Sequence, residues 1–280
     1  MRSRLVDADA LQRDGFYFPV RVFAADKAAA YRQQVLEWET VSARIGGDVR
    51  SRWNYPKVHL LAGWADEFVH EESLIDLAEA VIGPDLMVWS INIFKRAAGS
   101  GEDLAWHQDA PYFGWTGMIG KTVRIWVALT QTIPENGTMR FARGMHGELV
   151  AHAFRSNSPE DIMRGESVLV EVEEDTAVDV RLSPGEASMH LPTTVHCSTV
   201  NESDSDRLCV AVDFISPELF PSGEDSALLV RGQDQFGRFI HEPRLRVPYS
   251  PAALGEFRKA CQRRDRMIIG EYRKRARTDG

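Results

Sequence analysis

Three residues able to bind a transition metal stand at two places in this chain. His107 and Asp109 flank a single residue, and His196 follows 89 positions after His107. Two histidines and one carboxylate are the ligand set that holds Fe(II) on one face and leaves its other positions open. Residues two apart on a strand point to the same side, so His107 and Asp109 can reach one ion while Gln108 points away. The alternative for the His-x-Asp pair alone is a surface loop with solvated side chains.

An arginine opens the apolar segment that follows the second histidine. Alternation along this segment puts Arg207 on the same face as Asp213, with two small residues between them that leave room beside the guanidinium. The planar guanidinium of arginine matches a carboxylate, and a buried arginine needs such a partner. The alternative pairs Arg207 with Asp204 or Asp206 at a surface turn.

Two further strands carry polar residues in apolar surroundings. Ser90 and Asn92 share one face of the segment 86–94, and we expect the wet lumen of a β-barrel to satisfy their hydrogen bonds. Arg124 and Trp126 share a face of the segment 123–129, and we predict that both point into the same lumen. Plain core packing is the equal alternative for Trp126.

Composition excludes several classes of protein. The 280 residues carry 41 acidic and 33 basic side chains, a net charge of −8 that disfavours nucleic acid and anionic membranes as partners. The basic run within 263–277 fits a solvated helical face. Three cysteines without paired spacing favour a reducing compartment, and charges interrupt the first ten residues, so we expect a cytoplasmic protein without signal peptide or membrane span. We expect a monomer or homodimer.

Hydrophobic periodicity changes twice along the chain. Residues 1–85 are mostly helical in pattern, residues 86–216 alternate as strands with Gly, Pro and Asn between them, and 217–280 reads as a loop followed by a helix. With no linker or repeat, we predict one domain over 1–280, a β-barrel core with helices outside. Helices are predicted at 7–15, 24–43, 72–82 and 252–275, and strands at 16–23, 86–94, 123–129, 138–142, 167–172, 177–182, 187–191 and 207–215.

From about residue 15 to 215 the sequence resembles the phytanoyl-CoA dioxygenase family of Fe(II)/2-oxoglutarate oxygenases. The resemblance rests on the order and spacing of short motifs rather than on one pattern. These are Gly83-Pro84-Asp85, Lys95, Trp106-His107-Gln108-Asp109, Trp126 to Leu129, Glu135-Asn136-Gly137, Gly144-Met145-His146, Ser183-Pro184-Gly185, His196-x-Ser198, Asn201 and Arg207.

The resemblance implies a double-stranded β-helix (jelly roll) flanked by N- and C-terminal helices. It implies that His107, Asp109 and His196 bind Fe(II), and that Arg207 binds the distal carboxylate of the co-substrate 2-oxoglutarate with the help of Ser198. Gln108, Trp126 and the lumen-facing Asn92 would lie near that co-substrate. For the substrate we predict contacts from Tyr112, Trp115, Arg124 and Asp213.

One departure from the family pattern and one agreement with it bear on the function. Many members have a small residue at position 124, where this chain has an arginine that could reshape the substrate pocket. Family halogenases replace the carboxylate ligand by a small residue, and the presence of Asp109 disfavours halogenation.

The predicted function is oxidation of a small molecule at an unactivated C–H bond, with O2 as oxidant and release of succinate and CO2. The alternative is a cupin-type metal protein or isomerase that does not use 2-oxoglutarate. A polar segment at 153–175 is predicted to act as a lid, and a fixed surface excursion is its alternative.

Overall fold

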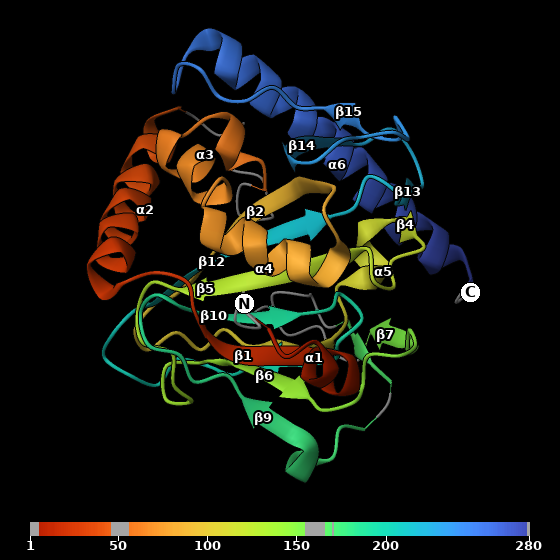
Figure 1. The fold of residues 1–280 in the computed structure, drawn as a ribbon. Coiled ribbons are helices and arrows are strands. Elements are labelled where there is room, and N and C mark those ends of the chain that lie inside the picture. Colours follow the sequence, from red (N-terminus) through yellow and green to blue (C-terminus); the bar gives the residue numbers. More distant parts are fainter. Residues whose placement is uncertain (1–5, 46–55, 155–165, 170, 279–280) are drawn as a thin grey trace. The chain divides into compact units, whose positions relative to one another are not determined.

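The computed structural model describes residues 6–45, 56–154, 166–169 and 171–278. The chain forms two compact units, each built from three stretches. The first unit comprises Met1–Ala29, Phe94–Ala110 and Trp126–Val210, and the second comprises Ala30–Ile93, Pro111–Ile125 and Ala211–Gly280. Figure 1 shows the elements of both. The prediction of a single domain stays a prediction.

Within the described residues, the first unit holds two larger antiparallel sheets and a separate two-stranded antiparallel pair, β7 (His152–Phe154) with β8 (Glu166–Val168). One of the larger sheets begins with β1 (Phe16–Arg21) beside β10 (Glu186–His190) and continues with the first-unit parts of β5 (Thr122–Ala128), β12 (Arg207–Ile215) and β2 (Leu86–Arg96). The other has four strands in the order β3 (Leu104–His107), β11 (His196–Ser198), β6 (Met139–Ala142) and β9 (Ala177–Asp179). Smaller elements are α1 (Ala8–Asp14) and η3 (Glu174–Thr176).

Aromatic side chains join these two sheets face to face. Phe16 of β1 stacks on Phe141 of β6 with ring centroids 4.6 Å apart, and His190 of β10 lies 5.0 Å from the same phenyl ring. Phe141 is fully buried. Such offset aromatic pairs add to the burial of apolar area, so the sheets of the first unit enclose an aromatic core.

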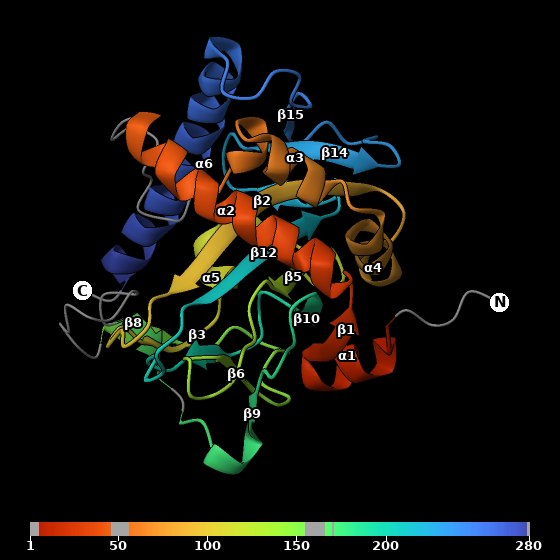
Figure 2. The same ribbon diagram turned by 90° about the vertical axis from the view of Figure 1, so that its left-hand side faces the viewer.

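The second unit contains the remaining residues of β5, β12 and β2, together with most of the helices. Here the strand order is β5-β12-β2, followed by β14 (Ser226–Arg231) antiparallel to β2 and β15 (Ile240–His241) parallel to β14. Helix α6 contacts β14 in this unit, and Figure 2 shows the steep angle between the two elements. The helices are most of α2 (Ala25–Ile45), η2 (Val58–Leu60), α3 (Gly63–Val69), α4 (Glu72–Ile82), α5 (Ala110–Phe113) and α6 (Pro251–Thr278), and β4 (Trp115–Thr116) pairs with β13 (Phe220–Pro221).

Helix boundaries follow the capping signals of the sequence. Asp7 accepts a hydrogen bond from the backbone N–H of Ala10 at 3.1 Å, and Gly15 ends α1 in the left-handed region with φ 86°. In α4 the buried residues include Leu74, Ala78 and Ile82, spaced by one helical turn. The predicted helices and most predicted strands are confirmed, but 217–280 is more than a loop and a helix, because β14 extends the sheet there.

A fully buried ion network ties distant parts of the second unit together. The ammonium group of Lys57 contacts Glu242 at 2.7 Å and donates to the carbonyl of Ser226 at 2.8 Å. His59 bonds the other oxygen of Glu242 at 2.8 Å. Burial alone would raise the pKa of Glu242, but Lys57 and His59 stabilise its anion and lower that pKa to about 2. The carboxylate is therefore the counter-charge that lets Lys57 stay inside.

No helix in the part of the chain that the structure describes is both long and apolar enough to span a membrane.

Glu242→Gln should destabilise the protein by roughly 3–5 kcal/mol at pH 7, because it leaves Lys57 buried without an anion. A group whose pKa is lowered on folding stabilises the fold above its ordinary pKa. The deficit should therefore shrink as the pH falls from 4.5 toward 2. Urea unfolding across this range measures it. The control is Glu256→Gln, which breaks an exposed pair with Lys259 on α6 and should change stability by less than about 0.5 kcal/mol. An equal deficit at all pH values would contradict the role of the anion.

Candidate metal centre

Strand pairing in the first unit brings the two predicted metal-binding histidines together. His107 ends β3 and His196 begins β11, and the two are direct partners in the antiparallel register. Their ring centroids lie 4.1 Å apart. Residues that oppose each other across antiparallel strands have adjacent side chains, so strand pairing brings together two histidines that are 89 positions apart in the sequence.

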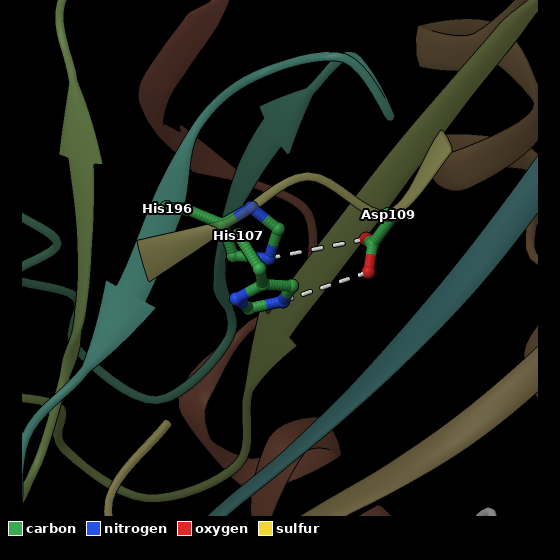
Figure 3. Close-up of side chains that lie close together, drawn as sticks. All are labelled: His107, Asp109 and His196. Atoms are coloured by element: carbon green, nitrogen blue, oxygen red, sulfur yellow. Dashed lines mark ion pairs between the residues drawn. The ribbon is translucent and has the colours of Figure 1, made fainter. Parts of the chain in front are cut away.

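Asp109 completes the group. Its carboxylate oxygens lie 3.8 Å from Nε2 of His107 and 3.9 Å from Nε2 of His196 (Figure 3). Both distances exceed a hydrogen bond, yet an ion bound at about 2.0–2.2 Å from each atom can bridge them. The three ligand atoms all lie within 4.8 Å of one another. The strand ends at His107, so Asp109 reaches the site from the bend that follows rather than from within the strand, as strand alternation would require.

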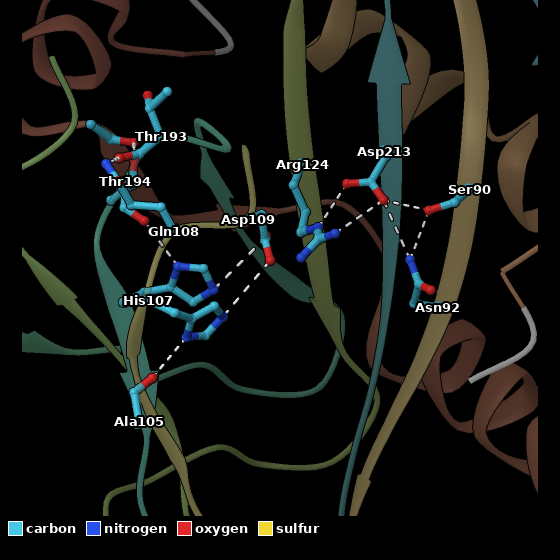
Figure 4. Close-up of polar contacts among 12 residues, drawn as sticks. Ser90, Asn92, Ala105, His107, Gln108, Asp109, Arg124, Thr193, Thr194 and Asp213 are labelled. Carbon is cyan, nitrogen blue, oxygen red and sulfur yellow. Dashed lines mark hydrogen bonds and ion pairs between the residues drawn. The ribbon is translucent and has the colours of Figure 1, made fainter. Parts of the chain in front are cut away.

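Backbone carbonyls orient both imidazole rings. Nδ1 of His107 donates to the carbonyl of Ala105 at 2.8 Å, and Nδ1 of His196 donates to that of Thr194 at 2.9 Å (Figure 4). A carbonyl oxygen can only accept, so each Nδ1 carries the proton and each Nε2 presents its lone pair on the side of Asp109. These two hydrogen bonds set the tautomer that a metal ligand needs, and the donor set fits a divalent ion.

The side chain of Gln108 bonds to neighbouring loops rather than to the two ligands that flank it. Its amide nitrogen donates to the carbonyls of Glu148 and Thr193 at 2.8 and 2.5 Å, and its oxygen accepts from the backbone N–H of Val150 at 2.9 Å. The backbone N–H of Gln108 donates to Nε2 of His152 at 3.1 Å. This side chain therefore holds neighbouring loops against the ligand strand, and its predicted contact with the co-substrate stays a prediction.

Arg207 is buried beside Trp126 in the first unit. Its guanidinium carbon lies 5.5 Å from the indole centre of Trp126, and Nη1 donates to the carbonyl of Gly137. Within the described stretches of the chain, Nε has no partner and Arg207 forms no ion pair. Burial lowers the pKa of Arg207. The surface pair with Asp204 or Asp206 is therefore wrong, because the side chain is only 4% exposed.

Gly137 occupies a position that requires glycine. Its φ is 73°, and a Cβ there would lie 2.6 Å from the carbonyl oxygen of Thr199. A side chain would push the turn away from the backbone of Thr199, and with it the carbonyl that binds Arg207. The Asn-Gly in the sequence motif thus positions the arginine.

Arg96 is a member of this site that the sequence did not single out. It donates through Nη2 to the hydroxyl of Ser198 at 2.5 Å and through Nη1 to the carbonyl of Glu102. Burial and the charge of Arg207 lower the pKa of Arg96 to about 10. Two arginines whose positive charges act on each other favour a nearby anion. Next to Lys95 at a strand end, Arg96 looks like a surface residue in the sequence, and only its burial distinguishes it.

The predicted substrate residues Arg124 and Asp213 bind each other in the second unit. Arg124 donates through Nε and Nη2 to the two oxygens of Asp213 at 2.7 and 3.1 Å (Figure 4). Ser90 donates to the same carboxylate, and Asn92 donates to Ser90 at 2.8 Å and to Asp213 at 3.3 Å. The alternation placed these side chains on the correct faces. A carboxylate rather than a wet lumen satisfies Ser90 and Asn92, and the roles predicted for them in ligand binding stay predictions.

Tyr112 and Trp115 join an aromatic cluster of the second unit. Trp115 packs edge-on against Trp89 with centroids 4.4 Å apart, and Phe113 lies 4.9 Å from Trp89. Tyr112 is partly buried against the same cluster. Most of the predicted lid at 153–175 lies outside the described residues.

With the fold and this site in view, comparison with known proteins identifies the family. The sequence pattern of the phytanoyl-CoA dioxygenase family matches residues 11–209. The chain belongs to this family. Over 152 residues it is 25% identical to the ectoine dioxygenase of Streptomyces coelicolor, a match covering 50% of this chain and 50% of that protein. The chain thus matches about half the length of this curated relative.

Solved structures agree on the fold. The non-heme monooxygenase ThoJ in its apo form is 40% identical, with a TM-score of 0.88 and coverage of 95% of this chain and 99% of that one. CytC3 with Fe(II) and alpha-ketoglutarate is 18% identical, with a TM-score of 0.64 and coverage of 88% and 95%. The predicted jelly roll with flanking helices is confirmed.

Asp109→Ala should weaken the binding of a divalent metal, because it removes a direct anionic ligand. Loss of a residue that only hydrogen-bonds to a metal ligand lowers metal affinity roughly 10–100-fold, so the effect of Asp109→Ala should be larger. Equilibrium dialysis against Co(II) measures this directly. Asp103→Ala removes an exposed carboxylate from the preceding residues and should leave affinity unchanged. Equal affinity of the two variants would show that Asp109 is not a ligand.

Proposed function

We propose that this chain is an Fe(II)- and 2-oxoglutarate-dependent oxygenase that hydroxylates a small molecule at an unactivated C–H bond. The observation that carries the proposal is the convergence of His107, Asp109 and His196, with both Nδ1 atoms bonded to carbonyls so that Nε2 is left for an ion. Family membership supports it. So does the presence of Fe(II) and alpha-ketoglutarate in CytC3, which has the same fold.

Each residue of the first-unit site has a role in this proposal. His107, Asp109 and His196 would hold Fe(II) on one face. Arg207 would bind the distal carboxylate of 2-oxoglutarate, aided by Ser198 and Trp126, and Arg96 would orient the Ser198 hydroxyl and add positive charge. The Nε of Arg207, which lacks a partner among the described residues, supports this assignment, because a buried guanidinium without a carboxylate is costly.

When bound, iron and 2-oxoglutarate supply the oxidation: O2 accepts electrons from both substrates, 2-oxoglutarate becomes succinate and CO2, and C–H becomes C–OH. The protein's own contribution is positional. Gln108 fastens loops around the ligand strand through three hydrogen bonds, and the buried aromatic core of Phe16 and Phe141 backs the sheet that carries His196. These contacts keep the ligands preorganised and water away from them.

The proposal is tested by succinate formation. Purified protein with Fe(II), ascorbate and O2 should form succinate from 2-oxoglutarate, faster when a screened metabolite is its substrate, and Asp109→Ala should abolish this. A protein that binds metal but forms no succinate with any substrate would instead be a metal protein of cupin type. The identity of the oxidised product then distinguishes hydroxylation from other outcomes.

Arg207→Ala should raise the apparent KM for 2-oxoglutarate by about two to four orders of magnitude, since losing a buried charge-assisted pair costs roughly 3–5 kcal/mol. Metal affinity should not change. Arg140→Ala removes an arginine of β6 that pairs with Glu174 and Asp179 near the surface, and its KM should equal that of the parent protein. A KM unchanged by Arg207→Ala would refute the assignment.

A further inference from the structure

Three hydrogen-bond donors of the second unit are buried around one indole and lack a partner among the described residues. Arg264 of α6 stacks on Trp89 with its guanidinium carbon 4.8 Å from the ring centre. Its Nε and Nη1 form no hydrogen bond there, although the residue is only 6% exposed. Trp115, packed edge-on against Trp89, likewise leaves its indole Nε1 without a partner. A solvated helical face was expected for this basic run, and for Arg264 that is wrong.

The carboxylates whose charges act on Arg264 are held by other groups. Asp213 is engaged by Arg124, Ser90 and Asn92. Asp225 accepts from the indole N–H of Trp89 at 2.6 Å and from the backbone of Ser226 at 2.8 Å. These anions offset the charge of the guanidinium without bonding to its Nε and Nη1 donors.

Asp265, the next residue of the same helix, is a neighbouring acid with a buried oxygen that lacks a hydrogen bond to the described chain. Consecutive residues of a helix point about 100° apart, and the described residues include no ion pair between Arg264 and Asp265. Burial of three unsatisfied donors is unfavourable, and an acceptor that enters from outside the chain would remove that cost.

We propose that Arg264, Trp115 and Trp89 form a recognition site for a planar oxygen acceptor, a carboxylate or an amide carbonyl, carried by an aromatic or apolar small molecule. The guanidinium and the indole N–H bind the oxygen. The apolar part packs on the cluster that contains Phe113 and Met267, whose border is formed by partly buried residues, including Tyr112 and Met118. Arginine recognises planar oxygen groups through its fork of N–H donors, and aromatic walls hold the attached apolar body.

The residues of this site all lie within the second unit. The existence of the binding site does not rest on the proposed function, so it can be tested on protein without metal or 2-oxoglutarate.

Calorimetric titration of the full chain with three probes tests the site. Phenylacetate and phenylacetamide share a ring and a planar oxygen acceptor, whereas 2-phenylethylamine has the same ring with a cationic donor. At least one acceptor probe should bind the parent protein, and the amine should bind at least tenfold more weakly. The stronger of the two acceptors identifies the ligand as an acid or an amide.

The matched variants are Arg264→Met and Arg263→Met. Arg264→Met keeps the length of the side chain but removes the donors, and it should weaken the acceptor probe at least tenfold. Arg263→Met removes the neighbouring arginine, which pairs with Glu224 at the surface, and should leave binding unchanged. If Arg264 has no partner in the free protein, Arg264→Met should also leave the melting temperature unchanged or raise it.

Three results would overturn the site: no binding of either acceptor probe to the parent protein, equal binding of the amine, or unchanged binding to Arg264→Met. A melting temperature lowered by several degrees in both Arg264→Met and Asp265→Asn would show instead that the two residues form a structural pair. Arg264-dependent binding in a protein that forms no succinate would leave the site intact and refute only the oxygenase.

Discussion

The candidate metal centre depends on the antiparallel pairing of β3 with β11. This register sets His107 opposite His196, and the carbonyls of Ala105 and Thr194, each two residues before its histidine, fix both rings. A shift of one residue would turn one imidazole to the other face of the sheet. The same pairing continues into β6, where Phe141 packs on Phe16. The register of these strands therefore determines the orientation of both imidazole rings and the packing of Phe141 together.

Both units contain buried cationic side chains. Whether such a side chain has a carboxylate partner within the protein indicates whether it stabilises the fold or is available to bind a ligand. Lys57 has a carboxylate and two carbonyls, so its charge holds strands and loops together. Arg124 has both oxygens of Asp213. Arg207 and Arg264 are as deeply buried but lack a carboxylate partner within the described chain. Because desolvation without a partner is costly, the incompletely satisfied arginines are the places where ligands of the right charge or polarity gain most.

Local patterns in the sequence were sufficient to predict most elements and the metal group. Leu74, Ala78 and Ile82 mark α4 by helical spacing, and Gly15 ends α1. The two histidines and Asp109 could be found because few other arrangements of these residue types suit one ion. Asp109, however, comes from a bend rather than from the strand. Resemblance to a family added the roles that spacing alone leaves open.

The features that escaped prediction are those that depend on contacts between distant segments. Lys57 and Glu242 stand 185 positions apart, and neither lies in a pattern that signals burial. Arg96 follows Lys95, and Arg264 lies in a basic run. Because neighbouring basic residues are typical of the protein surface, the sequence favoured an exposed position for both arginines. For Arg264 a signal was present, because Ala260, Met267 and Ile268 lie at helical spacing around it and are buried.

The pairing of Arg124 with Asp213 changes where specificity can reside. Both were predicted to touch substrate, but each now satisfies the other, so a ligand that binds Arg124 must compete with an ion pair whose Asp213 partner is 1% exposed. Because the charges of Arg124 and Asp213 already neutralise each other, the pair binds a charged ligand weakly but can hold neighbouring side chains in place. Arg124 lies with its guanidinium carbon 5.6 Å from the ring of Phe113. The arginine that departs from the family pattern therefore buttresses the aromatic cluster, and the buried donors of Arg264 and Trp115 are better placed to select what enters it.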